Sequence, residues 1–132
     1  MFPNPKAHVL IVDHDKATRQ IVCQMLDDLG YRTTAAGDGL EALSHLAEDG
    51  SLNFVMTDID MPHMNGWQLA DRIKAANPCI PIVALTDLPP NSVLPRLSGS
   101  SISHALFKPL QLDHLISVVT YILQSERQKC VN

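Results

Sequence analysis

The sequence has no run of basic residues longer than two, and its 132 residues carry a formal net charge of −4. Domains that bind nucleic acid need clustered basic side chains to neutralise phosphates, so we expect no nucleic-acid binding. No apolar run approaches the roughly 20 residues that span a bilayer. The first residues, MFPNPKA, lack the apolar centre of a signal peptide. We therefore expect a cytoplasmic domain that does not bind a membrane.

Cysteine and histidine are too few and too scattered for a structural zinc site. Cys23, Cys79 and Cys130 have no zinc-ligand spacing, and none of the six histidines forms a His-x-x-x-His pair. Three cysteines cannot all pair within one chain, so we expect reduced thiols, as in cytosolic proteins. What the chain does have is a globular balance of 45% hydrophobic and 18% charged residues, in a length that suits one domain.

Short apolar or β-rich runs alternate with segments of helical periodicity along the chain. Five of these runs are predicted strands, at 8–12, 31–36, 53–57, 80–86 and 104–107. Parallel strands need crossover connections, which the helical segments between the runs can supply. The pattern predicts an α/β fold: a flavodoxin-like, doubly wound, five-stranded parallel sheet of order 2-1-3-4-5.

Residue types at the ends of the helical segments support this prediction. Asp15 and Asn65 are placed to cap two helices at their N-termini, and Gly30 follows the first helical stripe as a stop. The last apolar stripe predicts a final helix over 111–125.

The segment 87–101, between the fourth and fifth strands, interrupts the pattern because it contains three prolines. An interior proline costs a helix about 3 kcal/mol, so we expect an irregular or shortened fourth helix. The rest of the chain divides into an N-terminal lead-in over 1–7, one folded domain over 8–125 and a C-terminal tail over 126–132.

Polar residues lie where four of the predicted strands end. They are Asp13, His14 and Asp15 after the first strand, Asp58 after the third, Thr86 at the end of the fourth and Lys108 after the fifth. Sheets of this order bind ligands at the carboxyl ends of their strands. Carboxylates hold a hard cation such as Mg²⁺, one carboxylate can form an aspartyl phosphate, and a lysine can neutralise phosphoryl oxygens. The sequence therefore predicts a phosphoryl-transfer site.

The motifs IVDHD, DIDMPHMNG, ALT and FKP, in this order and at these spacings, resemble those of response-regulator receiver domains of two-component signalling. The resemblance covers residues 8 to 124, and IVALT and FKPLQLDHL are most similar to receivers of hybrid sensor histidine kinases. It implies that Asp58 accepts a phosphoryl group from the phosphohistidine of a histidine kinase or phosphotransfer domain. The modification would then change a partner-binding surface.

The resemblance also implies roles for residues around the acceptor. Thr86 and Lys108 match the hydroxyl and the lysine of the receiver site, and Lys108–Pro109 would be a cis peptide. Such a domain catalyses its own phosphorylation and dephosphorylation and is not a metabolic enzyme.

A metal site is implied as well, formed by Asp13, Asp58, the backbone carbonyl of Asp60 and residue 14. Receivers have a second acid at this last position, whereas this chain has His14. Imidazole is a poor ligand for Mg²⁺ and suits softer divalent ions. We therefore expect weak Mg²⁺ binding, with Mn²⁺ as an alternative ion, and our hypothesis is that Asp15 reaches in to compensate.

A second departure affects the switch. Receivers carry an aromatic residue three positions before the lysine, where this chain has Ala105. Phe107 is predicted to lie on the same face of the strand and is a candidate to replace that aromatic. The segment 87–101 lies where receivers commonly contact their output partners, so the partner surface is expected to be unusual.

Two other functions remain open from the sequence. His14 and Ala105 favour a degenerate pseudo-receiver, a protein-interaction module independent of phosphorylation. The presence of Asp58, Thr86 and Lys108 argues against it. FVMTDID also resembles the first motif of haloacid-dehalogenase phosphatases, in which Asp58 would be the nucleophile and Asp60 the general acid. That motif normally opens its domain, whereas two strand–helix units precede it here.

Overall fold

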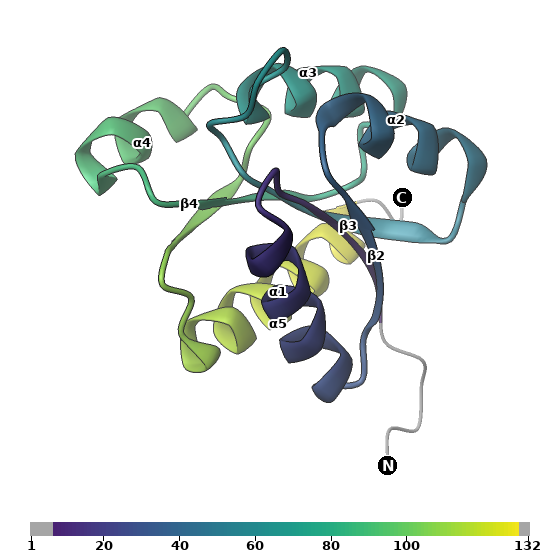
Figure 1. Ribbon diagram of the computed structural model, residues 1–132. Coiled ribbons are helices and arrows are strands. Elements are labelled where there is room, and N and C mark those ends of the chain that lie inside the picture. The colour runs from purple at the N-terminus through teal and green to yellow at the C-terminus, as the bar shows by residue number, and fades with distance from the viewer. Residues whose placement is uncertain (1–6, 130–132) are drawn as a thin grey trace.

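Strands and helices alternate along the whole of residues 7–129, the part of the chain that this computed structural model describes (Figure 1). The elements are β1 (His8–Val12), α1 (Lys16–Asp28), β2 (Arg32–Ala36), α2 (Gly39–Glu48), β3 (Leu52–Thr57), α3 (Gly66–Ala76), β4 (Ile82–Thr86), α4 (Pro90–Leu97), β5 (His104–Phe107) and α5 (Leu112–Lys129). The five strands form one parallel sheet of order β2-β1-β3-β4-β5, which confirms the predicted fold and strand order.

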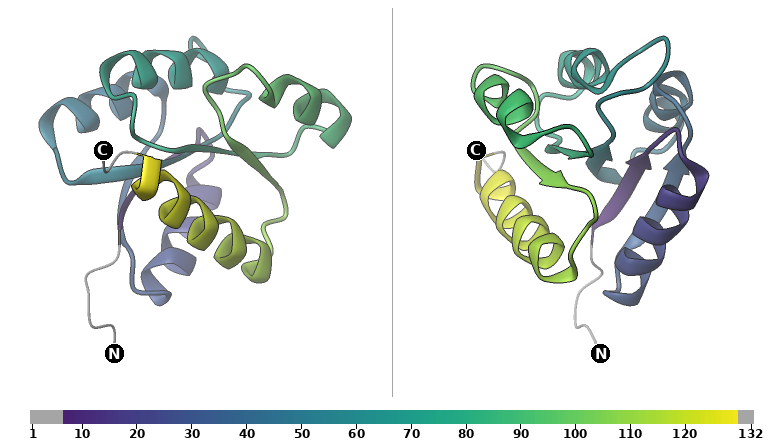
Figure 2. Two further views of the ribbon diagram at one scale, coloured as in Figure 1. Left: turned by 180° about the vertical axis from the view of Figure 1, so that it is seen from behind. Right: turned by 60° about the vertical axis from the view of Figure 1, so that its left-hand side comes forward.

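The sheet is the middle of three layers, with α1 and α5 on one face and α2, α3 and α4 on the other (Figures 1 and 2). Alternate residues of β1 enter the two cores: Val9 and Ile11 pack with α1 and α5, and Leu10 and Val12 pack on the opposite side. All five residues of β1 are buried, as expected of a central parallel strand covered on both faces. This burial fixes the strand ends that position the site.

Side chains cap two of the helices as the sequence predicted. Asp15 accepts a hydrogen bond from the Thr18 amide at the start of α1. Asn65 and Gln68 form a reciprocal capping box at the start of α3. Both caps immediately follow a strand end or its loop, so they also fix the direction in which the chain leaves the sheet.

Helix α4 is short, as its prolines predicted. It has eight residues, begins at Pro90 without a side-chain cap, and contains Pro95 in its interior. By contrast, α5 continues to Lys129, past the predicted helix end at 125, and residues 130–132 lie outside the described part. No helix within residues 7–129 is both long enough and apolar enough to cross a membrane.

The cysteines differ from the expectation of three reduced thiols. Cys79, in the turn after α3, is disulfide-bonded, whereas Cys23 on α1 is a free thiol. A disulfide needs two cysteines whose Cα atoms come within about 7 Å in the fold. Spacing along the chain does not reveal such proximity, which is why the prediction was wrong for Cys79. Cys130 lies outside the described residues.

Candidate functional site

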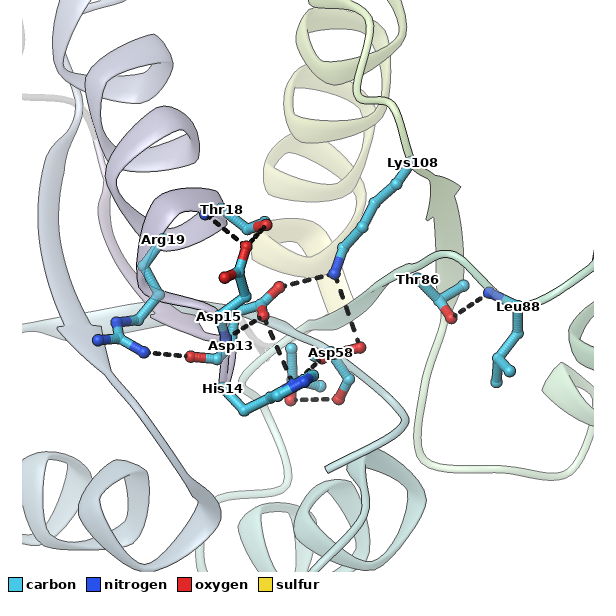
Figure 3. Close-up of polar contacts among 10 residues, drawn as sticks. Asp13, His14, Asp15, Thr18, Arg19, Asp58, Thr86, Leu88 and Lys108 are labelled. Carbon is cyan, nitrogen blue, oxygen red and sulfur yellow. Dashed lines mark hydrogen bonds and ion pairs between the residues drawn. The ribbon is translucent and has the colours of Figure 1, made fainter. Parts of the chain in front are cut away.

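The carboxyl ends of β1, β3 and β5 bring Asp13, Asp58 and Lys108 together at one edge of the sheet (Figure 3). Both carboxylates are almost completely buried, at 0% and 1% exposed. Their backbones continue the strand pairing, because the Asp13 amide donates to Ala36 O (3.1 Å) and the Asp58 amide donates to Val12 O (2.8 Å). The sheet therefore holds the two acids in place before any ligand arrives.

Asp13 is satisfied on both carboxylate oxygens. Lys108 Nζ donates to Asp13 Oδ2 (2.9 Å), and the Asp15 amide donates to Asp13 Oδ1 (2.9 Å). Arg19 adds a hydrogen bond from Nη1 to the Asp13 backbone oxygen (2.7 Å). A buried carboxylate needs such partners to offset the loss of water, and hydrogen bonds to ionised groups are strong. The carboxylate of Asp13 is thus held in one orientation by both of its oxygens.

Asp58 is paired on one side only. Its Oδ2 lies 2.8 Å from His14 Nδ1, so the imidazole N–H donates to the carboxylate. Its Oδ1 is buried without a hydrogen-bond partner among the described residues, and Lys108 Nζ lies 3.9 Å away. An unpaired buried acceptor costs free energy, so the fold keeps this oxygen available at a stability cost. Such an oxygen is suited to a ligand or an attack.

The pKa of Asp58 and the pKa of Lys108 are both raised, for different reasons. Burial raises the pKa of Asp58, the Asp13 charge raises it further, and Lys108 and His14 oppose both effects. Burial alone would lower the pKa of Lys108, but the hydrogen bond to Asp13 and the charges of Asp58 and Asp13 together raise it. Lys108 is therefore an ammonium at neutral pH.

The donor set fits a divalent cation. Asp13, His14 and Asp58 each offer one ligand atom, and these atoms all lie within 4.8 Å of one another. The His14 side chain is half-exposed, so the cluster is open to solvent on that side. Asp60 lies exposed in the loop after β3, where its backbone carbonyl remains a predicted fourth ligand.

Asp15 does not reach into this cluster. Its Oδ2 accepts hydrogen bonds from the Thr18 amide (3.1 Å) and the Thr18 hydroxyl (2.6 Å), which also lower the pKa of Asp15. Oδ2 of Asp15 therefore caps α1 in this structure, and compensation for His14 by Asp15 stays a prediction.

The sequence of residues 9–120 matches the response regulator receiver domain family. The chain belongs to this family. It is a receiver domain of two-component systems. Its strand order and five helices agree with the fold that the motif resemblance implied.

Similar proteins include receivers of hybrid sensor kinases. Over 112 residues the chain is 31% identical to sensor histidine kinase RcsC of Salmonella typhi, covering 85% of this chain and 12% of that protein. It is 34% identical over 121 residues to the virulence sensor protein BvgS of Bordetella bronchiseptica, covering 86% of this chain and 10% of that protein. The receiver thus corresponds to about a tenth of each relative's length.

Solved receivers share the fold along nearly the whole chain. The signal receiver domain of an HD domain-containing protein from Pseudomonas fluorescens Pf-5 superposes with a TM-score of 0.85 at 25% identity, covering 93% of this chain and 98% of that one. The Vibrio cholerae chemotaxis protein CheY4 gives a TM-score of 0.81 at 26% identity, covering 88% and 98%.

Thr86 of this receiver lies at the end of β4, next to the acidic cluster, but its side chain makes no hydrogen bond to that cluster among the described residues. Its Oγ1 accepts a hydrogen bond from the Leu88 amide (3.0 Å), away from the contacts of Asp58 in Figure 3. The side chain is fully buried at the end of β4. The Lys108 amide donates to the Thr86 backbone oxygen (2.8 Å), so the ends of β4 and β5 are tied. The hydroxyl keeps its own hydrogen to donate.

Ala105 and Phe107 share one face of β5, as predicted, since both pack against the core beneath α2, α3 and α4. Phe107 is the strand partner of Thr86, and Ala105 is the partner of Ala84. An open pocket of about 480 Å³ runs along this strand, with Ala105 and Phe107 in its lining. The small side chain at 105 leaves Phe107 as the aromatic nearest to Thr86 in the strand register.

Gly66 is a structural requirement that the sequence analysis missed. A Cβ at this position would lie 2.8 Å from Ile59 Cα and closer still to the Asp58 carbonyl oxygen. The Gly66 amide also donates to Ile59 O (2.8 Å), so the first residue of α3 presses directly on the acceptor loop. The sequence did contain a signal for this close approach, because a glycine follows the capping Asn65 at the helix start.

The Lys108–Pro109 peptide is cis, as expected.

Proposed function

We propose that this receiver accepts a phosphoryl group on Asp58 from the phosphohistidine of a histidine kinase or phosphotransfer domain in the cytoplasm. The observation that carries the proposal is the asymmetry of Asp58. Its Oδ2 is held by His14, while its buried Oδ1 lacks a hydrogen bond from the described residues and lies 3.9 Å from the Lys108 ammonium.

Oδ1 is the attacking atom in this mechanism. The Oδ1–phosphorus bond forms as the bond from phosphorus to the donor imidazole nitrogen breaks, and the electron pair of the broken bond returns to that nitrogen. Lys108 faces Oδ1 and neutralises the charge on the phosphoryl oxygens. The ammonium is held at this place by Asp13, which is itself fixed by the sheet.

Receiver domains typically bind Mg²⁺, and here Asp13, His14, Asp58 and the carbonyl of Asp60 would hold a divalent cation. When bound, such an ion supplies positive charge beside the transferring phosphoryl group. Imidazole in place of a carboxylate weakens the site for Mg²⁺, so Mn²⁺ is a candidate substitute.

The signalling response would follow from Thr86. A phosphoryl group on Asp58 brings oxygen acceptors to the end of β3, and the Thr86 hydroxyl has a hydrogen to donate to one of them. Turning toward that acceptor would break the bond from the Leu88 amide, which lies at the start of the segment leading into α4. The partner-binding surface would change at α4 and β5.

A test combines a small-molecule phosphodonor with intact mass. Acetyl phosphate and a divalent cation should add one phosphoryl group to the wild type and none to Asp58→Asn. The matched control is Asp113→Asn, which removes an exposed carboxylate on α5 and should be modified like the wild type.

A phosphorylated histidine kinase should label the same residue. Absence of labelling from both donors, with every metal tried, would overturn the proposal in favour of the degenerate pseudo-receiver. The close contacts among Asp13, Asp58 and Lys108 do not favour that alternative, because a domain that only binds partners has no need of an unpaired buried carboxylate oxygen.

A further inference from the structure

His14 makes the acidic cluster a mixed nitrogen and oxygen site. We propose that this site binds a first-row transition-metal ion in preference to Mg²⁺, with His14 Nδ1 as a direct ligand. The inference rests on the proposed function, since it concerns the ion that would accompany phosphoryl transfer to Asp58. It goes further by assigning the ligand atom and the class of ion.

The spacing of the donor atoms is that of neighbouring ligands on one ion. His14 Nδ1 lies 2.8 Å from Asp58 Oδ2 and 3.8 Å from Asp13 Oδ1. Metal–ligand bonds of about 2.0–2.2 Å place adjacent ligands of one ion about 3–3.5 Å apart. The imidazole nitrogen is therefore close to ligand spacing from both carboxylates, and all three donor atoms lie within 4.8 Å of one another.

His14 is the ligand that can adjust. Asp13 and Asp58 are buried and fixed through their backbones, whereas the His14 side chain is 51% exposed. In the neutral imidazole the hydrogen can sit on Nε2, which gives Nδ1 a lone pair in place of the hydrogen bond to Asp58. The ring can thus exchange a hydrogen bond for a metal bond without moving the buried acids.

The other polar atoms leave room for this exchange. Lys108 occupies Asp13 Oδ2, whereas Asp13 Oδ1 faces His14 and accepts one hydrogen bond, from the Asp15 amide, which leaves that oxygen a second lone pair. Asp58 Oδ1 is buried, unpaired among the described residues and on the side of Lys108, so Oδ2 is the Asp58 oxygen that lies beside His14. Each acid therefore uses one oxygen toward the His14 side and keeps the other toward Lys108.

Charge and ligand chemistry then decide which ion is preferred. A second carboxylate at position 14 would add negative charge, the main attraction for a hard ion that gives up water reluctantly. His14 removes that charge and supplies an imidazole nitrogen, which bonds more strongly to Mn²⁺, Co²⁺ and Ni²⁺ in increasing order. The substitution therefore weakens binding of Mg²⁺ and strengthens binding of the later ions.

The selectivity can be measured by titration calorimetry with MgCl₂, MnCl₂ and NiCl₂ separately. The variants are His14→Asp, which supplies the second acid, His14→Ala, and the control His114→Ala, which removes an exposed histidine on α5. The ratio of the Kd for Mg²⁺ to the Kd for Ni²⁺ should fall at least tenfold in both His14 variants and stay unchanged in His114→Ala.

A second measurement reports the bond itself. Pulsed electron paramagnetic resonance of the Mn²⁺-loaded protein should show coupling to an imidazole nitrogen in the wild type and in His114→Ala. The coupling should be lost in His14→Asp and His14→Ala. An unchanged ratio together with no nitrogen coupling in the wild type would overturn the inference.

Phosphorylation by acetyl phosphate, followed by intact mass, separates this inference from the proposed function. Nitrogen coordination without modification of Asp58 would retain the metal assignment and refute phosphoryl transfer. If Asp58 is phosphorylated but the wild type and His14→Asp have the same metal selectivity, phosphoryl transfer would be retained and the metal assignment refuted. A third outcome would also overturn the inference: the wild type is fully phosphorylated in excess chelator, but His14→Ala is not. His14 would then act in place of a metal.

Discussion

The acidic half of the site and the switch half lie on the same sheet edge but differ in how their polar groups are paired. In the acidic half, formed by Asp13, His14, Asp58 and Lys108, each side chain contacts another member within 4 Å. Three of the four residues follow the receiver pattern, and the fourth enters the same cluster with a different ligand atom. The chemistry is thus set by strand ends that the core holds rigidly.

In the switch half, formed by Thr86, Ala105 and Phe107, the side-chain hydrogen bond of Thr86 involves no residue of the acidic half. Thr86 bonds the Leu88 amide, and the residues on β5 contribute apolar surface only. Ala105 stands where receivers have an aromatic residue, and Phe107, the strand partner of Thr86, stays a candidate to replace it. The acidic half therefore keeps more of the receiver pattern than the switch half does.

Removing the charge that links the two buried acids should have the largest effect. Lys108→Met takes the ammonium from Asp13 Oδ2 and from the side of Asp58 Oδ1. We expect the rate of phosphorylation to fall on the order of 100-fold, since one preorganised electrostatic contact is typically worth that much. Rates with acetyl phosphate should be compared with Lys74→Met, on α3. Equal rates in the two variants would contradict the assignment of Lys108.

The backbone of the acidic half is packed closely against Gly66, so a side chain at this position should destabilise the fold. Gly66→Ala drives a methyl group into the backbone of Asp58 and Ile59, and overpacking of this kind costs about 1–3 kcal/mol. Gly50→Ala is the matched control, because a Cβ there meets nothing within 4 Å among the described residues. Urea denaturation should show the loss of unfolding free energy for Gly66→Ala alone. A neutral Gly66→Ala would mean that the acceptor loop yields easily.

The switch half is expected to fail without loss of transfer. Thr86→Ala leaves the Leu88 amide without its acceptor, at a cost of about 1 kcal/mol, whereas Thr86→Ser keeps the hydroxyl. Asp58 should be phosphorylated in both variants. The Leu88 amide resonance should shift on phosphorylation in the wild type and in Thr86→Ser, but not in Thr86→Ala. A shift of that resonance in Thr86→Ala would show that the response bypasses Thr86.

The smallest expected effect lies at the opposite end of the sheet, at His8. Its ring nitrogens lie 2.8 Å from Ser51 Oγ and 2.7 Å from Thr34 Oγ1. Burial lowers the pKa of His8, the Arg32 charge lowers it further, and Asp49 opposes both. The folded state therefore binds the His8 proton more weakly than the unfolded state.

This shift gives the direction of the pH dependence. The stability that His8 contributes is present above its unfolded pKa of about 6.5 and is lost as the pH falls below that value. The free energy of unfolding should decrease from pH 7 to pH 5, by less in His8→Asn than in the wild type. Parallel pH profiles for the two proteins would exclude His8 as the cause.

The fold was predictable from the sequence because its signals are local. Buried apolar runs, the caps at Asp15 and Asn65, and the prolines of 87–101 each act within a few residues of their position. The meeting of Asp58 with Lys108 also followed, since strand order alone brings strand ends together. These features depend on chain direction and burial rather than on side-chain orientation.

The side-chain details were not predictable for a physical reason. Each side chain at the site has several polar groups in reach, and the choice depends on distances that appear only in the folded chain. The Asp15 carboxylate accepts a hydrogen bond from the Thr18 hydroxyl, and the Thr86 hydroxyl accepts one from the Leu88 amide. The sequence had suggested roles for both residues nearer to the phosphoryl group. The close approach of Gly66 to the acceptor loop and the disulfide at Cys79 are likewise properties of proximity in space.

Lys108 has a further consequence because it contacts both halves at once. Its ammonium is held by Asp13, and its backbone amide is held by the carbonyl of Thr86. One residue therefore spans the two halves, with its ammonium in the acidic half and its backbone at the junction of β4 and β5. A substitution that shifts the backbone at Lys108 is thus expected to disturb both halves.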